Sequence, residues 1–85
     1  MTKAIKFYAT WCGPCKIYGK TWDKVSEELS KEVEFIEVNI DNDTQGLAAK
    51  YRIQSIPTTV VVKGDNVLKE VGLVKEDKLK ELILN

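Results

Sequence analysis

The spacing of hydrophobic positions along the chain changes several times and predicts alternating strands and helices. Four short segments are rich in β-branched and aromatic residues, which favours strands. These segments are residues 3–8, 33–40, 58–63 and 67–71. Elsewhere apolar residues recur every three or four positions, which is the period of a helix with one buried face.

Three helices follow from this period. They are predicted at residues 14–29, 47–51 and 76–84. The first begins at Pro14, whose missing N–H suits a first helical turn. Its apolar residues Tyr18, Trp22, Val25 and Leu29 are separated by four, three and four positions, so we expect them to form one buried stripe.

The order of the predicted elements, β-α-β-α-β-β-α, indicates the α/β class. The first two strands are joined through a helix and must be parallel, with a right-handed crossover. The last two are separated only by the turn at residues 64–66 and form an antiparallel hairpin. We expect a single domain, residues 1–85, with a mixed four-stranded sheet flanked by three helices, because 85 residues are too few for two cores.

Composition excludes several classes of function. Thirteen basic residues balance thirteen acidic ones, so bulk charge favours neither nucleic acid nor a membrane surface as a partner. No apolar run reaches the roughly 20 residues of a membrane helix. Lys3 and Lys6 interrupt the apolar residues at the amino end, so no signal-peptide core is expected there. The cytoplasm is therefore the expected compartment.

The candidate chemistry lies in Cys12 and Cys15, the two cysteines of the chain. A Cys-x-x-Cys pair between a strand and a helix indicates a dithiol–disulfide redox site. The first sulfur lies at the amino end of the helix, where free N–H groups and the helix dipole favour a negative charge. We expect Cys12 to be the attacking thiolate and Cys15 the resolving thiol. Two buried structural thiols, or half of a metal site shared between two chains, remain as alternatives.

The segment Trp-Cys-Gly-Pro-Cys at residues 11–15 resembles the active-site motif of the thioredoxin family. The resemblance extends over nearly the whole chain, through Asn39-Ile40-Asp41, Ile56-Pro57-Thr58 and Val71-Gly72. It implies a minimal thioredoxin fold, without the strand and helix that usually precede this core. It also implies reduction of disulfide-containing proteins, recycling by an NADPH-dependent thioredoxin reductase, no bound cofactor or metal, and a monomer.

The same resemblance implies roles for residues around the cysteines. Most X–Pro bonds are trans, but the resemblance implies that Pro57 is cis and faces the disulfide, with the Ile56 backbone pairing to an extended substrate. Trp11 is either a core aromatic or, as its position before Cys12 favours, a partly exposed cover over the site. The other members of an uncharged docking surface are Gly13, Pro14, Ile40, Ser55, Val71, Gly72 and Leu73. For Gly72 a turn at the strand end is an equally good explanation.

One pair of residues departs from the family pattern. Thioredoxins usually carry an acid six residues before the first cysteine and a lysine on the next strand, whereas this chain has Lys6 and Glu37 there. Either both side chains reach solvent past a short sheet, or both are buried and must be paired. A charged Lys6 cannot accept the proton of the resolving cysteine, so Glu37 or water becomes the expected acceptor.

Two other functions fit parts of the pattern. A glutaredoxin-like enzyme that uses glutathione has a similar length, but its motif normally has Pro-Tyr between the cysteines and two glycines before the last helix. A binding or accessory subunit with a thioredoxin fold would keep the architecture while its cysteines were incidental.

Overall fold

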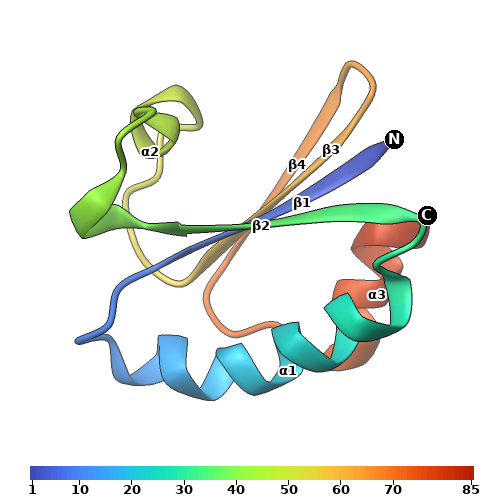
Figure 1. Cartoon of the computed structure of the whole chain (residues 1–85), viewed down its shortest axis with the longest axis horizontal. Coiled ribbons are helices and arrows are strands. Elements are labelled where there is room, and N and C mark those ends of the chain that lie inside the picture. The colour runs from blue at the N-terminus through green and yellow to red at the C-terminus, as the bar shows by residue number, and fades with distance from the viewer.

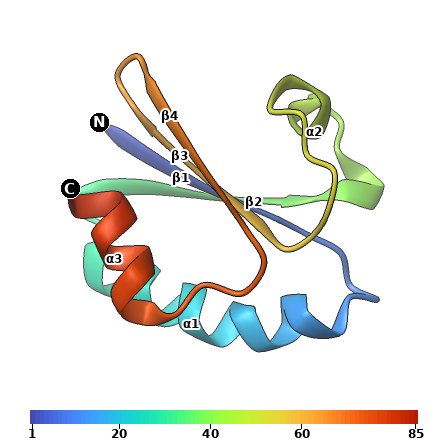
Figure 2. The ribbon, with the colours of Figure 1, turned by 180° about the vertical axis from the view of Figure 1, so that it is seen from behind.

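Four strands form one mixed sheet in the order β2-β1-β3-β4, in a computed structural model that describes all of residues 1–85 (Figure 1). The strands are β1 (Thr2–Tyr8), β2 (Val33–Asn39), β3 (Thr58–Lys63) and β4 (Asn66–Val71). The helices are α1 (Gly13–Leu29), the 3-10 turn η1 (Ile40–Asn42), α2 (Leu47–Lys50) and α3 (Glu76–Leu84). The helices α1 and α3 cover one face of the sheet and α2 lies on the other, as Figure 2 shows from behind.

The strand directions are those predicted. β1 pairs parallel with β2 and antiparallel with β3, and β3 pairs antiparallel with β4. The predicted second strand is one residue too long, because Ile40 already begins η1. The Asn39 side chain explains this end, since its Oδ1 accepts a hydrogen bond from the Asp41 amide at 3.0 Å and caps the turn.

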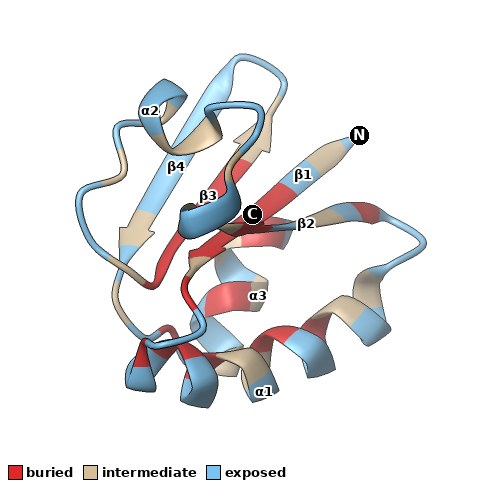
Figure 3. Cartoon of the chain, turned by 60° about the vertical axis from the view of Figure 1, so that its left-hand side comes forward, coloured by how far each residue is buried: buried red, intermediate tan, exposed pale blue.

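The larger part of the core lies between the sheet and the pair α1 and α3. Of the predicted stripe, Tyr18, Trp22 and Val25 are fully buried there, whereas Leu29 is only partly buried against the same cluster. Figure 3 shows the buried positions of α1 in red. The cluster also contains Ala4, Val33, Val61, Val74, Leu79 and Ile83. Two ion pairs, Lys24–Glu76 at 3.1 Å and Lys80–Glu28 at 2.7 Å, connect the outer surfaces of α1 and α3.

The opposite face of the sheet has a smaller core. Its buried residues are Ile5, Phe7, Val38 and Val60, covered by the half-buried residues of α2 and its flanking loops. The carboxylate of Asp43 accepts hydrogen bonds from the amides of the first two residues of α2, at 3.0 and 2.8 Å, so it stabilises the start of this short helix. No helix of the fold is long and apolar enough to span a bilayer.

Candidate active site

The two cysteines form a disulfide at the amino end of α1. Cys12 is the residue before the first helical turn, and its Sγ accepts a hydrogen bond from the Cys15 amide at 3.2 Å. A sulfur in this position accepts a hydrogen bond from one of the free N–H groups at the start of the helix, as a serine or aspartate side chain does at other helices. The predicted position of the first sulfur is thereby confirmed, and both cysteines are buried.

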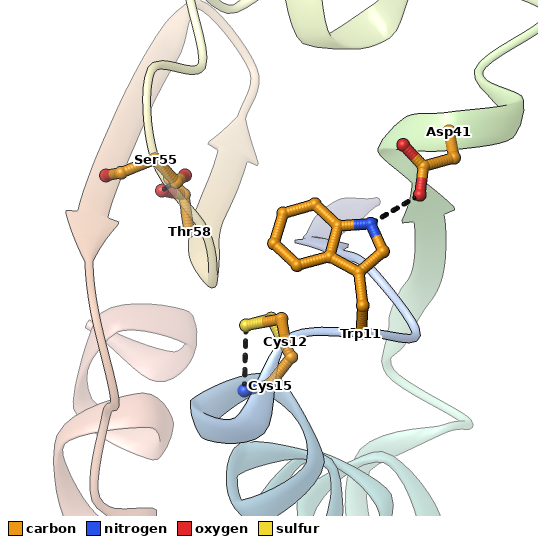
Figure 4. Close-up of a disulfide and its surroundings, with 6 residues drawn as sticks. All are labelled: Trp11, Cys12, Cys15, Asp41, Ser55 and Thr58. Atoms are coloured by element: carbon orange, nitrogen blue, oxygen red, sulfur yellow. Dashed lines mark hydrogen bonds between the residues drawn. A yellow bond between two sulfur atoms is a disulfide. The ribbon is translucent and has the colours of Figure 1, made fainter.

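The loop before β3 packs against this disulfide. Ile56 belongs to the half-buried residues that contact the cluster of Ala9 and the two cysteines. The Ile56–Pro57 bond is cis, as the resemblance implies. The Thr58 hydroxyl donates a hydrogen bond to the Ser55 carbonyl at 2.7 Å, which closes the loop on itself (Figure 4).

Gly72 connects a second loop to the first. Its amide donates a hydrogen bond to the carbonyl of Pro57 at 2.8 Å. Its φ of +94° lies in the left-handed region that glycine adopts without steric cost. The turn that was predicted as the alternative role of Gly72 therefore exists, and it holds the segment after β4 beside the loop that carries Pro57.

Trp11 is exposed over 67% of its surface and is not a core aromatic. Its indole Nε1 donates a hydrogen bond to Asp41 Oδ2 at 2.7 Å (Figure 4). A hollow of about 320 Å³ lies beside the indole and is lined mostly by apolar residues, among them Ile40, Ile53 and Ile56. The role of Asp41 was missed from the sequence, where only its place in the Asn39-Ile40-Asp41 segment gave a signal.

Exposed apolar side chains lie on several segments near the ends of the strands. Val71 and Leu73 are exposed, as predicted for a docking surface, and so are Gly13 and Pro14. Ser55 is exposed, whereas Ile40 and Ile56 are half-buried against the disulfide. Ile17 on α1 is a further exposed apolar residue that the sequence analysis did not identify.

Lys6 and Glu37 form an ion pair, with 2.9 Å between Lys6 Nζ and Glu37 Oε1. Neither of the two predictions describes the pair correctly. The Lys6 side chain is buried, with 6% of its surface exposed, while the Glu37 side chain is 50% exposed. The reason is topological: Lys6 lies on an inner strand beneath α1, whereas Glu37 lies on β2, one of the two edge strands of the sheet.

The geometry of a disulfide at a helix start, beside a cis-proline loop, agrees with the comparisons to known proteins. The family model described as Thioredoxin matches residues 2–85. The chain belongs to the thioredoxin family. It is a thiol–disulfide oxidoreductase, and its Cys12 and Cys15 form the disulfide.

Individual thioredoxins cover most of the chain. It is 40% identical over 79 residues to Thioredoxin-T of Drosophila melanogaster and 36% identical over 80 residues to a thioredoxin of Mycoplasmoides gallisepticum. The aligned segment covers 93% of this chain in both cases, but only 50% of the first protein and 78% of the second. The solved structure of Fasciola hepatica thioredoxin superposes with a TM-score of 0.83 at 33% identity, over 98% of this chain and 78% of that one.

Within this thioredoxin fold, a hydrogen bond between Tyr18 and Thr59 crosses from α1 to the sheet. The two hydroxyl oxygens are 2.6 Å apart and both residues are buried. Burial disfavours the charged phenolate and raises the pKa of Tyr18 to about 12, although the hydrogen bond from Thr59 lowers it in part. Tyr18 therefore stays neutral at pH values where an unfolded tyrosine is already ionised.

This raised pKa predicts a loss of stability at alkaline pH. Below pH 10, the ordinary value, Tyr18 is protonated in both states; between pH 10 and about 12 only the unfolded state releases the proton. The free energy of unfolding should fall over that window by up to about 3 kcal/mol through this group alone. Tyr18→Phe should remove this part of the pH dependence, at a cost near neutral pH of about 1 kcal/mol for the lost hydrogen bond.

Urea denaturation at several pH values checks this prediction. The oxidised protein is the right form, because its cysteines are in a disulfide and do not titrate. The two proteins share all their other ionisable groups, so the difference between the two curves isolates Tyr18. Parallel curves from pH 9 to 12 would contradict the prediction.

Proposed function

We propose that this oxidoreductase reduces disulfide bonds in other proteins and is recycled by an NADPH-dependent thioredoxin reductase. The observation that carries the proposal is the Cys12–Cys15 disulfide at the amino end of α1. The exposed apolar side chains of Trp11, Val71 and Leu73 support it, since they suit contact with an unfolded or extended protein segment.

The reaction proceeds through two exchange steps. The Cys12 thiolate attacks one sulfur of the substrate disulfide, forms a mixed disulfide and expels the other substrate sulfur as a thiolate. The Cys15 thiolate then attacks the Cys12 sulfur, forms the Cys12–Cys15 disulfide and expels the second substrate thiolate. The two electrons pass between sulfur atoms in both steps, so the reaction uses no bound cofactor or metal.

The assignment of Cys12 as nucleophile rests on its surroundings. Cys12 caps the amino end of α1, whereas Cys15 lies within the first turn of the helix, and the two residues are almost equally buried. The free N–H groups at the helix start therefore distinguish Cys12 as the sulfur that carries the negative charge. The free N–H of Cys15 that contacts Cys12 Sγ favours a thiolate there.

The surrounding loops form the proposed docking surface. The Ile56 backbone beside cis-Pro57 pairs with an extended substrate segment by adding a short strand. The hollow beside Trp11 accepts an apolar side chain of that segment. Gly13, Pro14, Ile40, Ser55, Gly72 and Leu73 complete the surface.

The organisation and location of the protein are part of the same proposal. We infer that residues 1–85 act as one domain and as a monomer, with neither nucleic acid nor a membrane as partner. A reducing compartment keeps such a dithiol available, and the cytoplasm is the compartment we propose. Some relatives are named mitochondrial thioredoxins, for example that of Bos taurus.

The test is to compare two sources of electrons, with insulin disulfides as the final acceptor. One reaction contains NADPH and thioredoxin reductase, and the other contains NADPH, glutathione and glutathione reductase. Turnover with thioredoxin reductase alone supports the proposal. Turnover with glutathione alone indicates a glutaredoxin-like enzyme, and turnover with neither, although dithiothreitol reduces the disulfide, indicates a dedicated reductase or a binding subunit.

A further inference from the structure

We propose that Lys6 is a positioning residue for the resolving step, because its buried ammonium group favours the thiolate form of Cys15. This inference rests on the proposed function, in which Cys15 attacks the mixed disulfide formed by Cys12. The group that promotes ionisation of the resolving cysteine is thus a positive charge and not a proton acceptor.

The charge is fixed in place by its contacts. Lys6 is the only buried residue of the chain that carries a formal charge. Its Nζ lies 2.9 Å from Glu37 Oε1, 5.0 Å from the centroid of the Tyr8 ring and 5.6 Å from that of the Trp22 ring. Aromatic faces attract a cation, so the two rings and the carboxylate hold the ammonium group under α1.

A cavity joins this ammonium group to the resolving cysteine. It has a volume of about 290 Å³, and Lys6, Cys15 and Gly19 are among the residues that line it. Gly19 of α1 lies directly beside the lysine, since a Cβ at this position would be in ordinary van der Waals contact with Lys6 Nζ, at 4.0 Å. Lys6 and Cys15 therefore line the same cavity.

The formal charges that line this cavity are all positive. Two lysines, Lys6 and Lys16, line it and no carboxylate does. Lys16 is exposed and screened by water, and Glu37 faces the lysine from β2 with half of its side chain in solvent. The remaining titratable groups nearby are the phenols of Tyr8 on β1 and Tyr18 on α1, and Tyr18 is hydrogen-bonded to Thr59 on β3.

The consequence for the resolving step follows from the sign of the charge. The Cys15 thiol must lose its proton before its sulfur can attack Cys12. A charged Lys6 cannot accept this proton, which passes to water or to the solvent-exposed Glu37 carboxylate. The positive charge of Lys6, which lines the same cavity, stabilises the thiolate that remains. The expelled substrate thiolate takes up a proton from water, which balances the step.

The experiment isolates Cys15 in the Cys12→Ser chain, where it is the single thiol. The ultraviolet absorbance of the thiolate, followed against pH, gives the midpoint of its ionisation without requiring a reagent to reach it. Lys6→Met should move this midpoint to higher pH by roughly one unit, since the loss of a nearby positive charge disfavours the thiolate. Lys6→Arg should restore the midpoint of the chain with Lys6.

Lys16→Met is the matched control, because it removes the other lysine of the same cavity. Its charge is exposed, so its removal should shift the midpoint by much less than Lys6→Met does. An unchanged midpoint in Lys6→Met would overturn the inference. An equal shift in Lys6→Met and Lys16→Met would also overturn it, because the buried charge would then have no larger effect on Cys15 than the exposed one.

The Lys6→Met variant is expected to fold. Methionine keeps most of the buried length, and the half-exposed Glu37 is left solvated rather than buried without a partner. Thermal unfolding checks this, and Lys6→Gln is the second uncharged variant, with the same expected shift.

The insulin assay on the unmodified chain keeps this inference separable from the proposed function. If insulin disulfides are reduced and the Cys15 midpoint does not depend on Lys6, the inference is wrong and the function stands. If the midpoint depends on Lys6 and insulin disulfides are not reduced, the function is wrong and the electrostatic effect of Lys6 on Cys15 stands.

Discussion

Cys12→Ser is expected to abolish disulfide reduction, with a loss of about a thousandfold or more in the rate of insulin reduction. A serine hydroxyl at the start of α1 keeps the hydrogen bond to the Cys15 amide but is not ionised near neutral pH, so no nucleophile remains. Cys15 is not expected to replace it, because Cys15 lies within the first turn of α1 and not at the amino end, where free N–H groups favour a thiolate.

Cys15→Ser is the matched variant and should give a different result. The first exchange step is intact, so a mixed disulfide between Cys12 and the substrate forms and persists, because the resolving thiol is missing. Mass spectrometry of the protein after exposure to a disulfide-containing peptide detects this adduct. The roles of the two cysteines would be reversed if Cys12→Ser retained the adduct and Cys15→Ser did not.

Trp22→Ala should cause the largest loss of stability among single substitutions in the core. The side chain is 1% exposed and contacts two other aromatic residues, with ring centroids 6.2 Å from Tyr18 and 5.3 Å from Phe35. Truncation of a buried tryptophan typically lowers the free energy of unfolding by about 3 to 5 kcal/mol. Since small domains have only about 5 to 15 kcal/mol in total, the variant should be close to unfolding at room temperature.

Trp11→Ala provides the control for this prediction, because Trp11 is the other tryptophan and is largely exposed. It should lower the free energy of unfolding by about 1 kcal/mol or less. Urea denaturation followed by far-ultraviolet circular dichroism compares the two without depending on tryptophan fluorescence. Equal midpoints for the two variants would contradict the assignment of Trp22 to the core.

Local patterns account for most of the secondary structure that the sequence predicts. The stripe of Tyr18, Trp22 and Val25 depends only on the helical period, and the hairpin turn depends on the residues at 64–66. The end of β2 was missed because Asn39 caps η1 through a side-chain hydrogen bond, although the same residue could equally have continued the strand.

The cysteine pair was identified from the sequence because its chemistry depends on a spacing within one helical turn. The cis state of Pro57 came from the family resemblance, since three residues do not by themselves determine the isomer. The hydrogen bond from Trp11 to Asp41 joins residues thirty positions apart, and no local pattern predicts it.

The sequence by itself thus determined the strand and helix order, the redox pair and the buried stripe of α1, because each depends on residues close together in the chain. Only the tertiary structure decided the state of Lys6 and Glu37. Their exposure depends on which strand lies at the sheet edge and on how closely α1 passes over Lys6 at Gly19. A charged residue on a strand can be either buried or solvated, and the packing of elements distant in sequence decides between the two. Here this packing buries Lys6 and leaves Glu37 half-exposed to water.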